Sequence, residues 1–227
     1  MVSPHEVRRS SRDRLLSAAA AEFAAKGFDG AKVDRIAARA RVNKAMVYYH
    51  FTNKAALYRA ILGEMFAAVA ESVESVRQTG GQPDQQLTRF IEAVAQNAIA
   101  RPYFPPMWLR EVAEGGRHLD DAVVIQMRRV IGTLSAILED GRKAGLFREV
   151  NPLVIQVSIV APLIMFAAAG PLRERYQHLV PRAPQGRAPV DELIAHVQTT
   201  ALAGLAVNGR LAASHQTSRT SRRRDRL

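Results

Sequence analysis

The stretch from Val33 to Phe51 carries the side chains whose chemistry is most informative. Apolar residues recur at helical spacing before and after residues 41–43, which predicts two short helices joined by a tight turn. The second helix presents cations, phenols and an imidazole beside its apolar stripe, on Lys44, Tyr48, Tyr49 and His50. Such groups position a protein on phosphates and base edges, so we expect this helix to bind a polyanion.

Longer helices must hold this pair in place. Asn43 can begin the second short helix, because its side-chain oxygen can accept from a backbone N–H of the first turn. An earlier helix is expected over residues 11–26, capped by Ser10 or Ser11 and stopped by Gly27. A later helix is expected over residues 54–78, after a cap at Asn53.

The remaining sequence also predicts helices and no strand, so the fold class is all-α. Three prolines in residues 102–109 predict an irregular path before a short helix to residue 114. After Gly170 and Pro171, the stretch to residue 180 can form a further turn or two, and three prolines predict a loop over residues 181–189. The other expected helices span residues 83–100, 119–144, 151–169 and 191–207.

The run from Ile36 to Leu62, IAARARVNKAMVYYHFTNKAALYRAIL, resembles the DNA-binding signature of the TetR family of one-component bacterial regulators. The match covers residues 8–62. The positions that fall on the family pattern are Ile36, Ala37, Ala40, Val42, Tyr48, His50, Phe51, Lys54 and Leu57. The resemblance implies an N-terminal three-helix DNA-binding domain, and a larger helical domain that binds an effector and forms a dimer.

Two residues depart from the family pattern. The family usually has Gly in the turn where this chain has Arg41, and Ser or Thr at the cap where it has Lys32. A non-Gly residue in a left-handed turn costs roughly 1–2 kcal/mol, so either the turn differs or Arg41 gains a contact such as a phosphate. The predicted DNA-binding residues are Lys32, Arg41, Asn43, Lys44, Ala45, Met46, Tyr48, Tyr49, His50 and Lys54.

The net charge of +11 is distributed unevenly along the 227 residues. Residues 1–60 hold 12 Lys and Arg against 5 Asp and Glu, residues 61–208 hold 14 against 15, and residues 209–227 hold 6 against 1. A basic lobe and a basic tail around a near-neutral middle are typical of a nucleic-acid binder with a separate second domain. We therefore expect a DNA-binding domain over 1–53, an effector-binding and dimerisation domain over 54–208, and a disordered basic tail over 209–227.

Other classes of protein are less consistent with the sequence. It has no cysteine, no targeting segment and no apolar run long enough to span a bilayer, so we expect a cytoplasmic protein without membrane contact. Glu111, Glu114 and His118 could share a helical face, but Gly115 and Gly116 interrupt it, and we expect no metal or other cofactor. No catalytic motif is present. An all-helical enzyme or binding protein for an apolar ligand remains the alternative, although it would not explain the basic lobe.

The middle of the chain suggests a mostly apolar cavity with a small polar end, supplied by Glu111. Each apolar residue taken singly is better explained as ordinary core, but an aromatic segment beside long helices favours a site for a neutral or cationic hydrophobic effector. The predicted effector-binding residues are Phe66, Val69, Phe90, Val94, Phe104, Met107, Trp108, Glu111, Met127 and Val130.

The helices over 151–169 and 191–208 have larger apolar faces than one domain needs to cover. We expect them to form the homodimer interface, as in the family, through Ile155, Ile159, Leu163, Val197, Leu202 and Leu205. A two-fold dimer suits a near-palindromic operator. The sequence thus predicts a repressor that a small molecule releases from DNA, with a ligand-dependent activator as the alternative.

Overall fold

The computed structural model describes residues 10–176, 178 and 189–207. Within these ranges the chain forms helices and no strand, apart from one isolated antiparallel bridge between Phe147 and Ala206. The predicted all-α fold class is confirmed. The structure does not describe residues 181–188 of the predicted loop or the predicted disordered tail.

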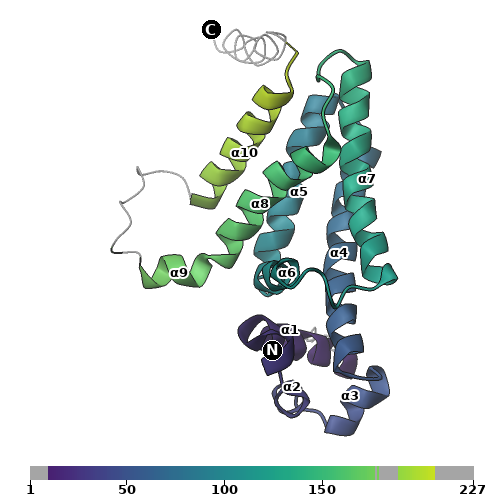
Figure 1. The fold of residues 1–227 in the computed structure, drawn as a ribbon, viewed down its shortest axis with the longest axis vertical. Helices are drawn as coiled ribbons and strands as arrows, with labels where there is room; N and C mark the ends of the chain where they lie inside the picture. Colours follow the sequence, from purple (N-terminus) through teal and green to yellow (C-terminus); the bar gives the residue numbers. More distant parts are fainter. Residues whose placement is uncertain (1–9, 177, 179–188, 208–227) are drawn as a thin grey trace, which may run out of the picture. The chain divides into compact units, whose positions relative to one another are not determined.

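The helices follow the expected order along the sequence (Figure 1). Their bounds are α1 (Ser11–Gly30), α2 (Val33–Ala40), α3 (Lys44–His50), α4 (Lys54–Thr79), α5 (Pro83–Ala100), α6 (Phe104–Ala113), α7 (Asp121–Lys143), α8 (Pro152–Ala168), α9 (Gly170–Arg175) and α10 (Pro189–Leu205).

These helices belong to two compact units that interleave along the chain. The first unit runs to Phe66 and resumes over Arg101–Ile125, while the second holds Ala67–Ala100 and everything described from Gln126 onward. The predicted domain boundary at residues 53 and 54 differs from this division, because the first half of α4 and helix α6 belong to the same unit as α1, α2 and α3 and contact α1.

The core of the first unit is built on the apolar side of α1. Phe23 is fully buried and contacts the Tyr58 ring edge-on, with ring centroids 4.9 Å apart. Ile36 of α2, Val47 of α3 and Leu57 of α4 are also completely buried. Each fully buried side chain of this size contributes about 1.5–3 kcal/mol relative to exposure, so these contacts fix the two short helices on α1 and α4.

Side-chain caps at the predicted positions begin three of these helices. Ser10 accepts from the backbone N–H of Asp13, Asn43 from Ala45 and Asn53 from Ala56, at 3.1, 3.0 and 2.8 Å. Gly27 has φ 70° and interrupts the helical path of α1, which then continues for one more turn to Gly30. The predicted caps and the predicted break at Gly27 are confirmed.

The irregular path predicted for residues 104–109 is wrong. Helix α6 already begins at Phe104, with Pro105 and Pro106 in its first turn. The first backbone N–H groups of a helix have no partner within it, so proline is tolerated there and its fixed φ favours the start of a helix. The proline signal therefore marked a helix start.

In the second unit, α5 packs against α8 and α10, and α8 and α10 pack against each other (Figure 1). Phe90 and Ile91 of α5 and Ile159 of α8 are completely buried. Arg129 of α7 binds both carboxylate oxygens of Glu74 in the second half of α4, at 2.9 and 2.6 Å. This unit thus combines an apolar core with a bidentate ion pair between neighbouring helices.

The connection after α7 is tightly packed. Gly141 lies against the Phe147 ring so closely that a Cβ atom at this position would overlap the ring. The backbone beside Phe147 binds the end of α10, because Arg148 N–H donates to Leu205 at 2.8 Å and Val207 N–H donates to Leu146 at 3.3 Å. These contacts fasten the last described helix to the turn after α7.

Candidate nucleic-acid interface

Helix α3 is anchored on one side and open on the other. Val47 is completely buried and Phe51, directly after the helix, is 6% exposed. On the opposite side Tyr48 and Tyr49 are 49% and 79% exposed. Tyrosine combines an apolar ring with a polar hydroxyl and is enriched at interfaces, so this face of α3 is the candidate contact with DNA.

The turn between α2 and α3 has the left-handed conformation in which the family usually has glycine. Arg41 has φ 54° and ψ 48°, and it is the one non-glycine residue with positive φ in the described part of the chain. Its backbone N–H donates to Ala38 and that of Val42 donates to Ala37, both at 3.1 Å, which closes the end of α2. The departure from the family pattern therefore leaves the turn unchanged and places Arg41 under backbone strain of about 1–2 kcal/mol.

An exposed lysine lies at the start of each helix of the pair. Lys32 occupies the cap position of α2 and makes no side-chain cap bond, as expected for a residue without an acceptor. Lys44 pairs with Asp34 of α2 at 2.7 Å, and this hydrogen bond raises the pKa of Lys44. Both partners are exposed, so the pair is weak and phosphate can replace Asp34 as the partner of Lys44.

Two predicted DNA contacts have protein partners in the structure. The Nε2 atom of His50 lies 3.0 Å from the Ser11 hydroxyl at the start of α1. The Lys54 ammonium donates to the carbonyl oxygens of Phe28 and Ala31 at 2.9 and 3.2 Å, and lies 4.6 Å from the centre of the Phe28 ring. The structure therefore leaves Lys44, Ala45, Tyr48 and Tyr49 exposed on α3. His50 and Lys54 instead make bonds that hold α1 to α3 and α4.

The predicted effector residues are divided equally between the two units. In the first unit the Phe66 ring stands edge-on to Phe104 and to Trp108, at 5.1 and 5.0 Å between ring centroids. Met107 is completely buried and Trp108 is half-buried. The predicted residues of the second unit are mostly buried within it, and they are Val69, Phe90, Val94, Met127 and Val130.

Glu111 is 1% exposed and binds groups of the protein itself. One carboxylate oxygen accepts from the backbone N–H of His118 at 2.8 Å. The other lies 3.0 Å from both the Tyr58 hydroxyl and the Nδ1 atom of His118. Burial, followed by the charge of Glu111, raises the pKa of Tyr58, so the phenol remains a donor to the carboxylate. Glu111 thus joins α6 to α4 and to the segment after α6.

Four of the six predicted dimer residues lie in the core of the second unit. Ile159, Leu163, Val197 and Leu205 are at most 4% exposed within one chain. Because they are buried there, they are not available to a second copy in this structure. Ile155 and Leu202 are half-buried. The exposed apolar residues of α8 are Leu153, Val154, Val157 and Met165.

Two family models match the chain. Bacterial regulatory proteins of the tetR family match residues 15–61, and the tetracyclin repressor-like C-terminal domain matches residues 83–197. Together they cover more than half of the sequence. The first match contains α2, α3 and the start of α4, and the second runs from α5 into α10.

Individual proteins agree with these matches. The HTH-type transcriptional repressor NicS of Pseudomonas putida is 26% identical over 158 residues, covering 69% of this chain and 74% of that protein. The HTH-type transcriptional activator FasR of Mycolicibacterium smegmatis is 35% identical over 86 residues, covering 38% and 39% respectively. A solved tetR-family regulatory protein from Rhodococcus RHA1 has a TM-score of 0.71 at 19% identity, covering 87% of this chain and 98% of that chain.

The family and these relatives are transcription regulators and not enzymes. Within the described ranges, no helix combines the length and the apolar character that crossing a membrane requires. The anchored α3 helix with its exposed tyrosines stands in the part of the chain that the first family model matches. The chain therefore belongs to the TetR family and is a DNA-binding transcription regulator.

Proposed function

We propose that the protein is a cytoplasmic, homodimeric repressor that a small, largely hydrophobic molecule releases from a near-palindromic operator. The observation that carries the DNA part of this proposal is α3, which is anchored by Val47 and Phe51 and exposes Tyr48 and Tyr49. A two-fold dimer presents two such helices to major grooves about 34–36 Å apart, so the operator has two related half-sites.

The predicted DNA-binding residues divide into three groups under this proposal. Lys44, Ala45, Met46 and Tyr49 read base edges, since they lie in the first turns of the helix or on its most exposed position. Tyr48, together with Lys32 and Arg41 beside the helix, contacts phosphate. Asn43, His50 and Lys54 act through the bonds that set the position of α3.

Repression is favoured over activation by the extent of similarity. The match to a protein named as a repressor covers 69% of this chain, whereas the match to a protein named as an activator covers 38% of it. An operator-bound dimer that overlaps a promoter blocks polymerase sterically. In vitro transcription from such a promoter distinguishes the two, because a repressor lowers the transcript level and an activator raises it.

We propose that the effector contacts the apolar residues predicted from the sequence. These residues lie in two units, and the residues of each unit are tested separately. In the first unit, the Phe66, Phe104 and Trp108 rings offer apolar surface and an indole that reports binding by fluorescence. In the second unit, Phe90 and Val94 of α5 are the residues to vary. Glu111 is now proposed to position α4 and α6, because its oxygens already bind Tyr58 and His118.

A ligand releases DNA only if it binds the DNA-incompetent state more tightly, and the coupling is reciprocal. Operator DNA must therefore weaken effector binding by the same factor by which the effector weakens operator binding. Titrating candidate hydrophobic cations and neutral molecules while following Trp108 emission, with and without operator, measures how much the operator weakens effector binding. Release of operator DNA without any change in Trp108 emission contradicts the proposed site beside Trp108.

Selection of bound duplexes from a random pool tests the function directly. We expect a two-fold symmetric consensus whose half-sites are separated by about one helical turn. Tyr48→Ala combined with Tyr49→Ala serves as the matched control, because both side chains are exposed and their loss leaves the core intact. Recovery of no consensus by the wild-type protein, or of the same consensus by the control variant, contradicts the proposal.

A further inference from the structure

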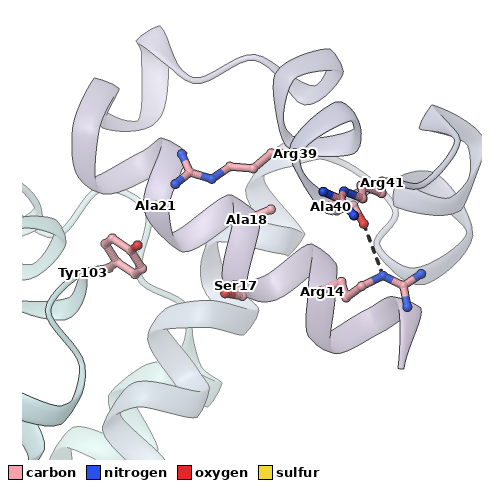
Figure 2. A pocket seen from close by; sticks show the side chains of 8 residues that line it. All are labelled: Arg14, Ser17, Ala18, Ala21, Arg39, Ala40, Arg41 and Tyr103. Atoms are coloured by element: carbon pink, nitrogen blue, oxygen red, sulfur yellow. Dashed lines mark hydrogen bonds between the residues drawn. The ribbon is translucent and has the colours of Figure 1, made fainter. Parts of the chain in front are cut away.

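A hollow of about 340 Å³ lies in the first unit, on the side of α1 and α2. Figure 2 shows its lining residues, which come from α1, from α2 and its turn, and from the residue before α6. We call it the arginine hollow. Its lining residues are Arg14, Ser17, Ala18, Ala21, Arg39, Ala40, Arg41 and Tyr103.

The charge of the lining is strongly positive. Three of its eight residues are arginines, and none of these eight is acidic. Arg14 Nε donates to the Ala40 carbonyl at 3.2 Å, which fixes its guanidinium beside the end of α2. Arg35, one turn before Arg39 on α2, lies 3.7 Å from Glu22, whereas Arg39 and Arg41 have no carboxylate partner among the described residues. Their charges are therefore available to an anion.

The strain at Arg41 is a second, independent observation. Glycine would hold the same left-handed turn without the cost of a Cβ atom, so an arginine there indicates that its side chain supplies an interaction. Arg41 lines the arginine hollow. The strained residue and the concentration of charge therefore occur at the same place.

The rest of the lining indicates what kind of anion fits. Ala18, Ala21 and Ala40 form a flat apolar floor, and the Ser17 hydroxyl can donate a hydrogen bond. Tyr103 lies at the rim with 37% of its surface exposed. Figure 2 shows Arg39 extended over the floor in the direction of Ala21 and Tyr103, while Arg14 and Arg41 lie at the other end. The hollow thus has guanidinium groups at both ends and an aromatic ring at the end that Arg39 approaches.

We propose that the arginine hollow binds a small organic phosphate, with the phosphate between the guanidinium groups and a flat organic group against Tyr103. A phosphate monoester carries a charge of about −1.5 to −2 at neutral pH, which suits several arginines better than the single charge of a DNA phosphodiester. A volume of about 340 Å³ is at the lower end of the range for small-molecule sites. This site is separate from the effector residues proposed above, but it shares Arg41 with the proposed DNA phosphate contacts.

The experiment is calorimetric titration of the full-length protein with phenyl phosphate, which has a doubly charged head and a flat ring. Arg39→Gln and Arg41→Gly should each weaken binding by about tenfold or more, because each loses a charge-assisted contact. Arg41→Gly also relieves the strained turn, so a loss of binding in this variant is not a loss of folding. Arg110→Gln, an exposed arginine of the same unit outside the hollow, is the matched control and should leave the affinity unchanged.

Tyr103→Ala tests the organic end of the site. It should weaken phenyl phosphate but leave the affinity for inorganic pyrophosphate unchanged, since pyrophosphate has no ring. Equal weakening of the two probes overturns the position given to the ring.

Three further results overturn the proposal. The first is equal affinity for phenyl phosphate in the wild type and in the Arg39 and Arg41 variants. The second is an equal loss in Arg110→Gln, which would indicate a diffuse effect of surface charge. The third is no binding of phenyl phosphate together with weaker binding of random-sequence duplex DNA by the two variants. That result would make the arginine hollow a contact for the DNA backbone.

Discussion

The ammonium group of Lys54 donates a hydrogen bond of 2.9 Å to the carbonyl oxygen of Phe28, so the first residue of α4 closes the end of α1. Both residues are in the first unit, and the Lys54 ammonium also lies over the Phe28 ring. The carbonyl groups at the end of a helix lack partners within it and carry partial negative charge. A cation supplied by the next long helix therefore stabilises the junction on which α3 rests.

Replacing Lys54 should reduce the stability of the protein. Lys54→Met retains most of the apolar stem but loses the charged donor, and we expect unfolding to become easier by about 1.5–3 kcal/mol, the range for hydrogen bonds that involve a charged group. Urea denaturation followed by circular dichroism measures the change. Unchanged stability combined with a tenfold loss of operator binding would instead identify Lys54 as a direct phosphate contact.

The two exposed tyrosines of α3 should differ in what they recognise. Tyr49→Ala should change the preferred bases, with discrimination between operator variants altered by about 1–3 kcal/mol. Tyr48→Ala should weaken binding to all duplexes by a similar factor, because phosphate contacts carry no sequence information. Binding assays on a panel of single-base operator variants separate the two patterns. A uniform loss for Tyr49→Ala would contradict this division.

Glycine at position 41 should stabilise the fold. Arg41→Gly removes the strain of a left-handed arginine, and we expect a gain of about 1 kcal/mol. Arg39→Gly is the matched control, because the same change within the regular part of α2 should cost about 1 kcal/mol. Thermal and urea unfolding of both variants give the sign of each effect. A loss of stability in Arg41→Gly would show that the arginine side chain makes an intramolecular contact worth more than the strain.

Tyr58 gives the protein a specific sensitivity to alkaline pH. Burial, then the charge of Glu111, raises the pKa of Tyr58 above its ordinary value of 10.0, so the neutral phenol is favoured by folding. This contribution is complete below pH 10.0 and is lost as the pH rises through the higher pKa of the folded state. Urea denaturation at several alkaline pH values should show a decrease in stability that is smaller in Tyr58→Phe. Tyr48→Phe, which changes an exposed phenol, should keep the decrease of the wild type.

We propose the exposed apolar side of α8, formed by Leu153, Val154, Val157 and Met165, as the dimer surface. Val157 is 57% exposed in one chain, and Val157→Glu should therefore preserve the fold of the protomer while preventing association. Sedimentation velocity gives the molecular mass, and circular dichroism gives the helical content. Val112→Glu, a change at a 56% exposed valine of α6, is the control and should remain dimeric. A stable dimer of the Val157 variant would place the interface elsewhere.

Local sequence signals predicted the helices well. The caps at Ser10, Asn43 and Asn53 and the break at Gly27 depend on short-range geometry that the residue types themselves encode. The exposed face of α3 was also predictable, because apolar and polar residues alternate there at helical spacing.

What the sequence did not reveal depends on contacts between distant segments. Helix α8 is apolar nearly all round, so its pattern could not distinguish buried Ile159 from exposed Val157. The partners of Lys54 are backbone carbonyls, which have no signature in the sequence. The sequence did not single out Arg39, because only the fold brings Arg14 and Tyr103 from other segments into the same hollow.

The division into two units has a consequence for recombination among related regulators. The chain passes between the units at Phe66 and Ala67, at Ala100 and Arg101, and at Ile125 and Gln126, and the first and last of these junctions lie inside α4 and α7. A chimera that exchanges only the residues before α4 would separate α1 from its partners Tyr58 and Lys54. Exchange of DNA specificity between such proteins should therefore succeed by changing surface residues of α3, and fail where whole segments are joined at the loop before α4.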